Sequence, residues 1–260
     1  MKGVELLGAC CNYGQKRYGP RMAPYAVEGK LGITMQKVKD DPTTQIFDYD
    51  LLYSTHAAMS QKDNIVTIGG DHSISYSTIS SALKTYGDSL HVIWIDAHTD
   101  INTQSTSASQ NLHGMPVGHL MGFENHPTTT FDHVNLDPSQ ITYIGIRDID
   151  PPEYERLEDY NIEGFPINSF SYTITQYLKR RLQHKNIYLS IDVDSLDPRE
   201  FPCTGTPVRN GMYMKELLTL VDTLKDNAVG MDIVEFDPLS NKKFTDTCLG
   251  HIEKLINVYI

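Results

Sequence analysis

The sequence has few cysteines and no dense cysteine pattern. Disulfide-rich scaffolds and structural zinc knuckles depend on closely spaced cysteines, often in C-x-x-C pairs, and the sequence contains no such pair. It therefore points to neither class and favours a reducing, cytoplasmic setting. The four cysteines are Cys10, Cys11, Cys203 and Cys248.

Long apolar runs and an excess of basic residues are also missing. No stretch of 18 consecutive apolar residues occurs, and the apolar start MKGVELLGAC is too short for a signal sequence, so we expect a soluble chain. Acidic residues outnumber basic ones, 33 to 22, which gives a formal net charge of −11 at pH 7. Nucleic acids and anionic membrane surfaces would repel such a chain, so we expect neither as a partner.

Short apolar runs recur along the chain, separated by polar stretches with helical spacing. The runs are VELLG, NIVTIGG, HVIWID, ITYIGI, NIYLSID and GMDIVEF. They are continuous rather than alternating, which is typical of strands buried on both faces. Helical spacing appears in segments 73–87, 172–183 and 214–226, and no repeat or linker divides the chain. We predict a single domain over residues 1–260, with a three-layer α/β/α fold around a mostly parallel central sheet.

Polar residues gather at the ends of five predicted strands. In open α/β sheets, ligands bind beyond the carboxyl ends of the strands. One D-x-D or D-H-S sequence after a strand is more often a loop or a helix cap than a site. Five such coincidences predict an acidic rim at one edge of the sheet. The rim residues are Asp71 and His72, Asp96 to Asp100, Asp148 and Asp150, Asp192 and Asp194, and Glu235 and Asp237.

The acidic rim requires a cation. Side chains at alternate positions of a strand share a face, so the rim carboxylates come close together, repel one another and raise each other's pKa values. Arg147 is the only basic residue near the strand ends, which favours two divalent metal ions as counter-charge. Carboxylate and imidazole without thiolate suit Mn²⁺, with Zn²⁺, Co²⁺ and Ni²⁺ as alternatives. The residues of this predicted centre are Asp96, Asp100, Asp192 and Asp194, with neutral His72 and His98.

Five blocks of the sequence resemble, in the same order, the signature blocks of the ureohydrolase superfamily, which includes arginases and agmatinases. They are GGDHS (69–73), DAHTDINT (96–103), NLHGMP (111–116), SIDVDSLDP (190–198) and MDIVEFDP (231–238). The resemblance implies an arginase-like fold, two Mn²⁺ ions per subunit and a homo-oligomer, either a trimer or a hexamer. The six metal ligands that it implies are His72, Asp96, His98, Asp100, Asp192 and Asp194.

The resemblance also implies hydrolysis of a guanidino substrate by a metal-bridging hydroxide. A guanidinium is permanently cationic, so its hydrolysis needs a strong nucleophile and an anionic anchor. Glu235 resembles the guanidinium-binding glutamate of the family, because a carboxylate can accept paired N–H bonds from the guanidinium fork. His113 resembles the histidine that delivers a proton to the departing amine. The expected catalytic residues are His113, Glu235 and Asp100.

The loop DINTQSTSASQNLHG resembles the arginase form of its block and implies L-arginine as substrate, with L-ornithine and urea as products. L-Arginine has an α-ammonium group and, unlike agmatine, an α-carboxylate, so polar groups are expected at the far end of the pocket. The expected substrate-binding residues are Asn102, Ser107, Ser109, Asn111, Asp150, Glu153 and Thr206. A ureohydrolase of agmatine, guanidinobutyrate or formimidoylglutamate remains an alternative, as does a catalytically inert regulatory protein.

Overall fold

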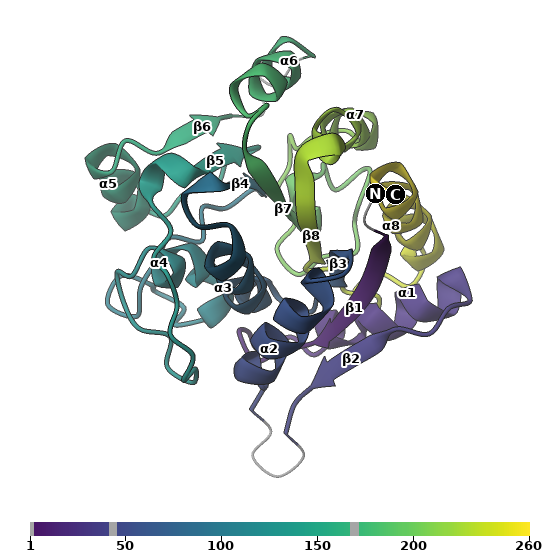
Figure 1. Cartoon of the computed structure of the whole chain (residues 1–260). Helices are drawn as coiled ribbons and strands as arrows, with labels where there is room; N and C mark the ends of the chain where they lie inside the picture. Colours follow the sequence, from purple (N-terminus) through teal and green to yellow (C-terminus); the bar gives the residue numbers. More distant parts are fainter. Residues whose placement is uncertain (1–2, 42–45, 167–171) are drawn as a thin grey trace.

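A single eight-stranded sheet forms the centre of the protein in the computed structural model, which describes residues 3–41, 46–166 and 172–260 (Figure 1). The strand order is β2-β1-β3-β8-β7-β4-β5-β6, and every pairing is parallel. The strands are β1 (Val4–Cys10), β2 (Gln36–Lys39), β3 (Asn64–Ile68), β4 (Leu90–Ile95), β5 (Ile141–Ile144), β6 (Glu163–Phe165), β7 (Asn186–Asp192) and β8 (Ala228–Val234). The helices are α1 (Ala23–Leu31), α2 (Tyr49–Ser60), α3 (Ser75–Tyr86), α4 (Pro116–Leu120), α5 (Pro151–Asp159), α6 (Tyr172–Arg181), α7 (Met214–Leu224) and α8 (Thr245–Tyr259).

Helices cover both faces of the sheet. Helices α1, α6, α7 and α8 pack on one face, while α2, α3 and α4 pack on the other (Figure 1). On β4, Ile93 and Ile95 belong to the core of the first face, whereas Val92 and Trp94 belong to that of the second. This alternation follows from the two-residue period of a strand.

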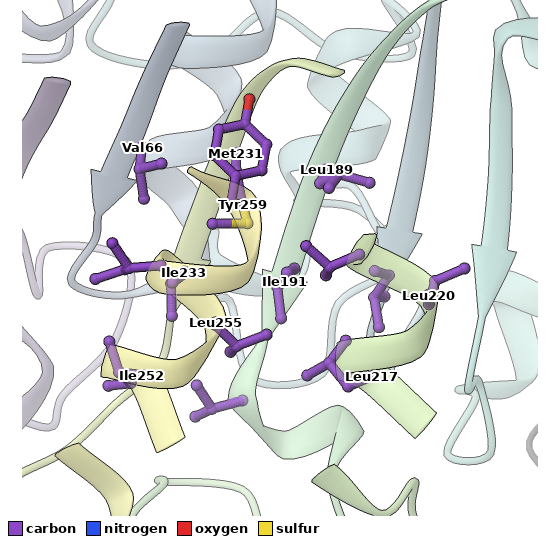
Figure 2. Packing of buried hydrophobic residues seen from close by; sticks show 14 of the residues in the cluster. Val66, Leu189, Ile191, Leu217, Leu220, Met231, Ile233, Ile252, Leu255 and Tyr259 are labelled. Carbon is purple, nitrogen blue, oxygen red and sulfur yellow. The ribbon is translucent and has the colours of Figure 1, made fainter. Parts of the chain in front are cut away.

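Figure 2 shows the first core from close by, where β7 and β8 meet α7 and α8. Leu189 and Ile191 of β7 lie in the same buried cluster as Leu217 of α7 and Leu255 of α8, and each of these side chains is fully buried. Full burial of one such side chain contributes roughly 1.5–3 kcal/mol. The apolar interior therefore holds the strand ends, and the side chains that follow them, in fixed positions.

The structure confirms the predicted three-layer architecture, and the sheet is entirely parallel among the described strands. All six predicted strands form, as do helices in the three segments with helical spacing. Strands β2 and β6 were not predicted. Both lie at an edge of the sheet with one neighbour each, so QKVK and EGF need no continuous apolar run. The single domain over residues 1–260 stays a prediction.

Because all the strands are parallel, their carboxyl ends share one edge of the sheet. The loops at this edge pack closely, as Gly70 shows: a Cβ added there would lie 1.7 Å from the carbonyl oxygen of Cys11. Only glycine fits that approach between the ends of β1 and β3.

All four cysteines are buried free thiols. Within the parts of the chain that the structure describes, none of the helices has the length and apolar character that a membrane crossing requires.

Candidate metal and substrate site

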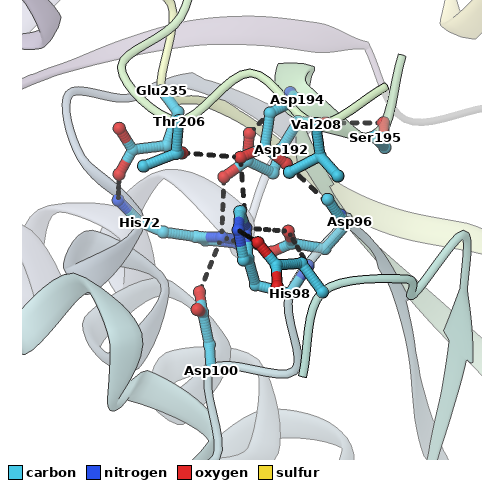
Figure 3. Close-up of polar contacts among 12 residues, drawn as sticks. His72, Asp96, His98, Asp100, Asp192, Asp194, Ser195, Thr206, Val208 and Glu235 are labelled. Carbon is cyan, nitrogen blue, oxygen red and sulfur yellow. Dashed lines mark hydrogen bonds and ion pairs between the residues drawn. The ribbon is translucent and has the colours of Figure 1, made fainter. Parts of the chain in front are cut away.

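A first cluster of predicted ligands surrounds His72, which follows β3. The His72 Nδ1 atom lies 3.0 Å from Asp96 Oδ2, beyond the end of β4, and 3.1 Å from Asp100 Oδ2 (Figure 3). Ligand atoms of these three residues all lie within 4.8 Å of one another. Asp192 Oδ2, at the end of β7, lies 3.5 Å from the same nitrogen. One imidazole and three carboxylates thus face a common point.

A second cluster lies next to the first and shares Asp96 with it. The His98 Nδ1 atom lies 3.4 Å from Asp96 Oδ1 and 3.2 Å from Asp194 Oδ2. Asp96 therefore turns one carboxylate oxygen toward each cluster, the arrangement expected of a carboxylate that bridges two cations. The structure brings all six predicted ligand side chains into this pair of clusters.

The donor set fits divalent metal ions. His72 Nδ1 is buried and makes no hydrogen bond, although three carboxylate oxygens lie within 3.5 Å. Burial is the main cause that raises the pKa of Asp100 to about 7, and repulsion from Asp96 is the second. Burial and the charge of Asp194 raise the pKa of Asp192 well above its usual range. A cation at each cluster would satisfy the imidazole nitrogen and let the carboxylates ionise together.

Side chains that the sequence analysis missed fix the ligands in place. The His72 ring stacks on Trp94, with ring centroids 4.1 Å apart, and its Nε2 lies 2.9 Å from Ser190 Oγ. The Trp94 indole N–H donates to Asp96 Oδ2 over 3.0 Å. Trp94 and Ser190 precede two predicted ligands, Asp96 and Asp192, by two residues at the ends of β4 and β7. The two-residue period of a strand could have found these partners, although it does not place His98, Asp100 and Asp194, which lie beyond the strands.

Glu235, directly after β8, lies beside the clusters and is 1% exposed. Its Oε1 accepts a hydrogen bond from the backbone N–H of His72 over 2.9 Å and lies 3.0 Å from His113 Nδ1. Burial alone would lower the pKa of His113, but the charge of Glu235 raises it to about 9. Glu235 and Asp100 have φ values of 63° and 50°. Left-handed backbone is rare for such residues and is concentrated at functional sites.

A further residue, Gln15, was not predicted. Its Nε2 donates to Glu235 Oε2 over 2.6 Å, from the loop that follows β1. The rule that ligands gather beyond strand ends marks the loop after β1 as part of the site, but it does not single out Gln15 within that loop.

A polar cavity of about 230 Å³ opens onto the two clusters. Two of the residues that line it are hydrogen-bonded to each other, since the Asn102 amide donates to Asp150 Oδ2 over 3.2 Å. Glu153 is 4% exposed, and its Oε2 accepts a hydrogen bond from the backbone N–H of Asp150 over 2.8 Å. The predicted residues among those that line the cavity are His98, Asp100, Asn102, Ser107, Ser109, His113, Asp150, Glu153, Asp192 and Thr206.

Five predicted residues are not among those that line this cavity: the proposed ligands His72, Asp96 and Asp194, together with Asn111 and Glu235. Asn111 is half-buried and precedes the short 3-10 turn Leu112–Gly114. Glu235 lies beneath His113 rather than on the wall. Asp148, by contrast, lines the cavity and lies 3.6 Å from His98 Nε2, although the sequence analysis had placed it only on the acidic rim.

A parallel α/β sheet with paired carboxylate and imidazole clusters at its carboxyl edge defines the class of this protein. The chain belongs to the arginase family, whose model matches residues 2–252.

Known relatives agree with this assignment. The chain is 40% identical to an arginase from Eremothecium gossypii over 185 residues, which cover 66% of this chain and 46% of that protein. It is 38% identical to an arginase from Saccharomyces cerevisiae, over 72% of this chain and 61% of that one. The chain thus matches 46% and 61% of the lengths of these curated relatives. A crystal structure of Entamoeba histolytica arginase with L-ornithine has the same fold, with a TM-score of 0.82, 25% identity and coverage of 99% of this chain and 98% of that one.

Proposed function

We propose that this chain is a dinuclear-metal hydrolase that converts L-arginine and water to L-ornithine and urea. The observation that best supports the proposal is the pair of clusters joined by Asp96, with the buried carboxylate of Glu235 beside them. Membership of the arginase family and similarity to proteins named arginase point the same way.

Two divalent ions per subunit fit the clusters, and Mn²⁺ is the metal we propose, because the donors are oxygen and imidazole nitrogen without thiolate. Bound metal ions supply a nucleophile at neutral pH by lowering the pKa of water. The proposed ligands are His72, Asp96, His98, Asp100, Asp192 and Asp194.

Glu235 binds the guanidinium in this proposal. Its carboxylate is buried, anionic and already oriented by donors from the protein, so it can accept N–H bonds from the planar head group. His113 provides the proton for the departing amine. With a pKa of about 9 the imidazole is protonated at neutral pH, which is the form a general acid needs.

The far end of the cavity selects the amino-acid part of the substrate. Asn102, Ser107 and Ser109 offer amide and hydroxyl donors for an α-carboxylate. Asp150 and Glu153 offer carboxylates for an α-ammonium. Agmatine keeps an ammonium group but has no carboxylate, so it would leave the donors of Asn102, Ser107 and Ser109 without that partner. Asn111 and Thr206 complete the proposed set, with Asn111 acting from outside the lined cavity.

Hydrolysis of several substrates tests this assignment, measured as urea from the three guanidino compounds and as formamide from formimidoylglutamate. Purified chain is assayed with L-arginine, agmatine, guanidinobutyrate and formimidoylglutamate, with and without added Mn²⁺, alongside elemental analysis for bound metal. We expect the highest kcat/KM for L-arginine and about two manganese ions per chain. Faster turnover of agmatine would refute the choice of substrate, and a metal-loaded chain inactive on all four would favour a regulatory protein. We further propose a single domain, a cytoplasmic location and a homotrimer or homohexamer, which sedimentation analysis tests.

A further inference from the structure

Gln15 is one of the donors that orient Glu235, and the proposed chemistry gives it no role of its own. Its side chain is 9% exposed, and its amide Nε2 donates to Glu235 Oε2 over 2.6 Å. The same nitrogen lies 3.5 Å from His113 Nδ1. Gln15 therefore lies beside both the proposed guanidinium anchor and the proposed proton donor, which also contact each other.

Backbone hydrogen bonds hold the loop that carries Gln15 against the site. The backbone N–H of Gly14 donates to Asp71 Oδ2 over 2.8 Å, and the Gly14 carbonyl accepts from the N–H of His113 over 3.1 Å. A Cβ added at Gly14 would lie 2.6 Å from Asp71 Oδ1 and 2.9 Å from the His113 nitrogen. Only glycine allows this approach, and the approach sets the position of the next residue, Gln15.

The donors around Glu235 are distributed unevenly. Oε1 faces the His72 N–H and the His113 ring, while Oε2 has Gln15 as its side-chain donor. A carboxylate oxygen has two lone pairs, so a single donor fixes the direction of Oε2 and leaves one lone pair for a ligand. The amide is also neutral. A lysine or arginine in its place would cancel the charge that attracts a guanidinium.

We propose that Gln15 is a positioning residue that orients Glu235 Oε2 toward the guanidinium of the substrate without neutralising it. This inference rests on the proposed function, because it assumes that Glu235 binds the guanidinium. It assigns a specificity role to the loop after β1, which lies about 220 residues from Glu235 in the sequence.

The test compares Gln15→Met, which keeps the length of the side chain but has no donor, with the metal-loaded wild type. We expect KM for L-arginine to rise about 10- to 100-fold, the range typical of losing a hydrogen bond to a charged group, with kcat changed less than KM. Manganese content and melting temperature should stay at the wild-type values. Gln15→Lys should raise KM further, because its ammonium competes with the substrate for Glu235. The exposed neighbour Lys16 provides the matched control, and Lys16→Met should behave like the wild type.

A second comparison separates positioning from a general structural role. If Gln15 acts only through Glu235, then Gln15→Met should cause no further loss of kcat/KM in a Glu235→Gln background. Should Gln15→Met fail to fold, Gln15→Asn keeps the amide on a shorter side chain and should show the same rise in KM.

Three results would overturn the inference: a KM within twofold of wild type, a loss that follows lost manganese, or full additivity with Glu235→Gln. Any of these, with an active wild type, leaves the proposed function intact. A metal-loaded wild type that releases no urea from L-arginine overturns the proposed function and this inference with it.

Discussion

Replacement of Glu235 by glutamine tests the centre of the proposed chemistry. The substitution Glu235→Gln keeps the volume of a side chain that is 1% exposed, so it removes the charge without opening a cavity. The six proposed metal ligands keep their side chains. Substrate binding and turnover should therefore change while metal binding does not.

The expected magnitude follows from the bonds that the carboxylate offers. A guanidinium fork can donate two charge-assisted hydrogen bonds to it, and each contributes about 1.5–3 kcal/mol. Their loss corresponds to about 3–6 kcal/mol, or a fall in kcat/KM of about 10²- to 10⁴-fold. The new amide also turns a donor toward Gln15 Nε2 or toward His72 N–H, since both now donate to the carboxylate. This mismatch places the expected effect toward the upper end of the range.

The assay is urea release over a range of L-arginine concentrations, at fixed excess Mn²⁺, with metal content measured on the same preparation. Glu5→Gln makes the same charge change on an exposed part of β1 and serves as control. A kcat/KM for Glu235→Gln within tenfold of the control, with manganese bound, would refute the role of Glu235 as anchor.

Two further predictions concern the metal centre and the core. Loss of a residue that only hydrogen-bonds to a metal ligand typically lowers metal affinity about 10- to 100-fold. Asp100→Ala removes a proposed ligand itself, a carboxylate 3.1 Å from His72 Nδ1. It should therefore weaken manganese binding more than 100-fold in titration calorimetry and abolish most activity. Substantial turnover of that variant with excess manganese would contradict the ligand assignment. Burial lowers the pKa of His56 to about 4. Between pH 6.5 and pH 4 this histidine is therefore protonated in the unfolded chain but not in the folded chain. The free energy of unfolding falls as the pH falls through this range. Urea denaturation should show the wild type losing about 2 kcal/mol more than His56→Gln between pH 7 and pH 5, whereas equal losses would show that His56 is not the group that titrates.

Some features of this protein follow from the sequence alone, because they depend on local rules. Residues that directly follow a buried parallel strand emerge at the carboxyl edge of the sheet, so Asp96, His98 and Asp100 had to lie near one another, as did Asp192 and Asp194. The expected strand alternation does not place them, because β4 ends at Ile95 and β7 at Asp192. Continuous apolar runs required a parallel sheet covered on both faces, and parallel strands end at one edge. These rules, with the family resemblance, gave the architecture and the six side chains that the structure brings together.

The tertiary structure decided what depends on distant parts of the chain meeting at fixed distances. The sequence could not show that the two oxygens of Asp96 face different clusters, because that depends on how β3, β4 and β7 pack. Nor could it show that Gln15, at the other end of the chain, reaches Glu235. Strand periodicity sets the direction of a side chain relative to its own strand, whereas hydrogen bonds between loops depend on the packing of the whole sheet and its helices.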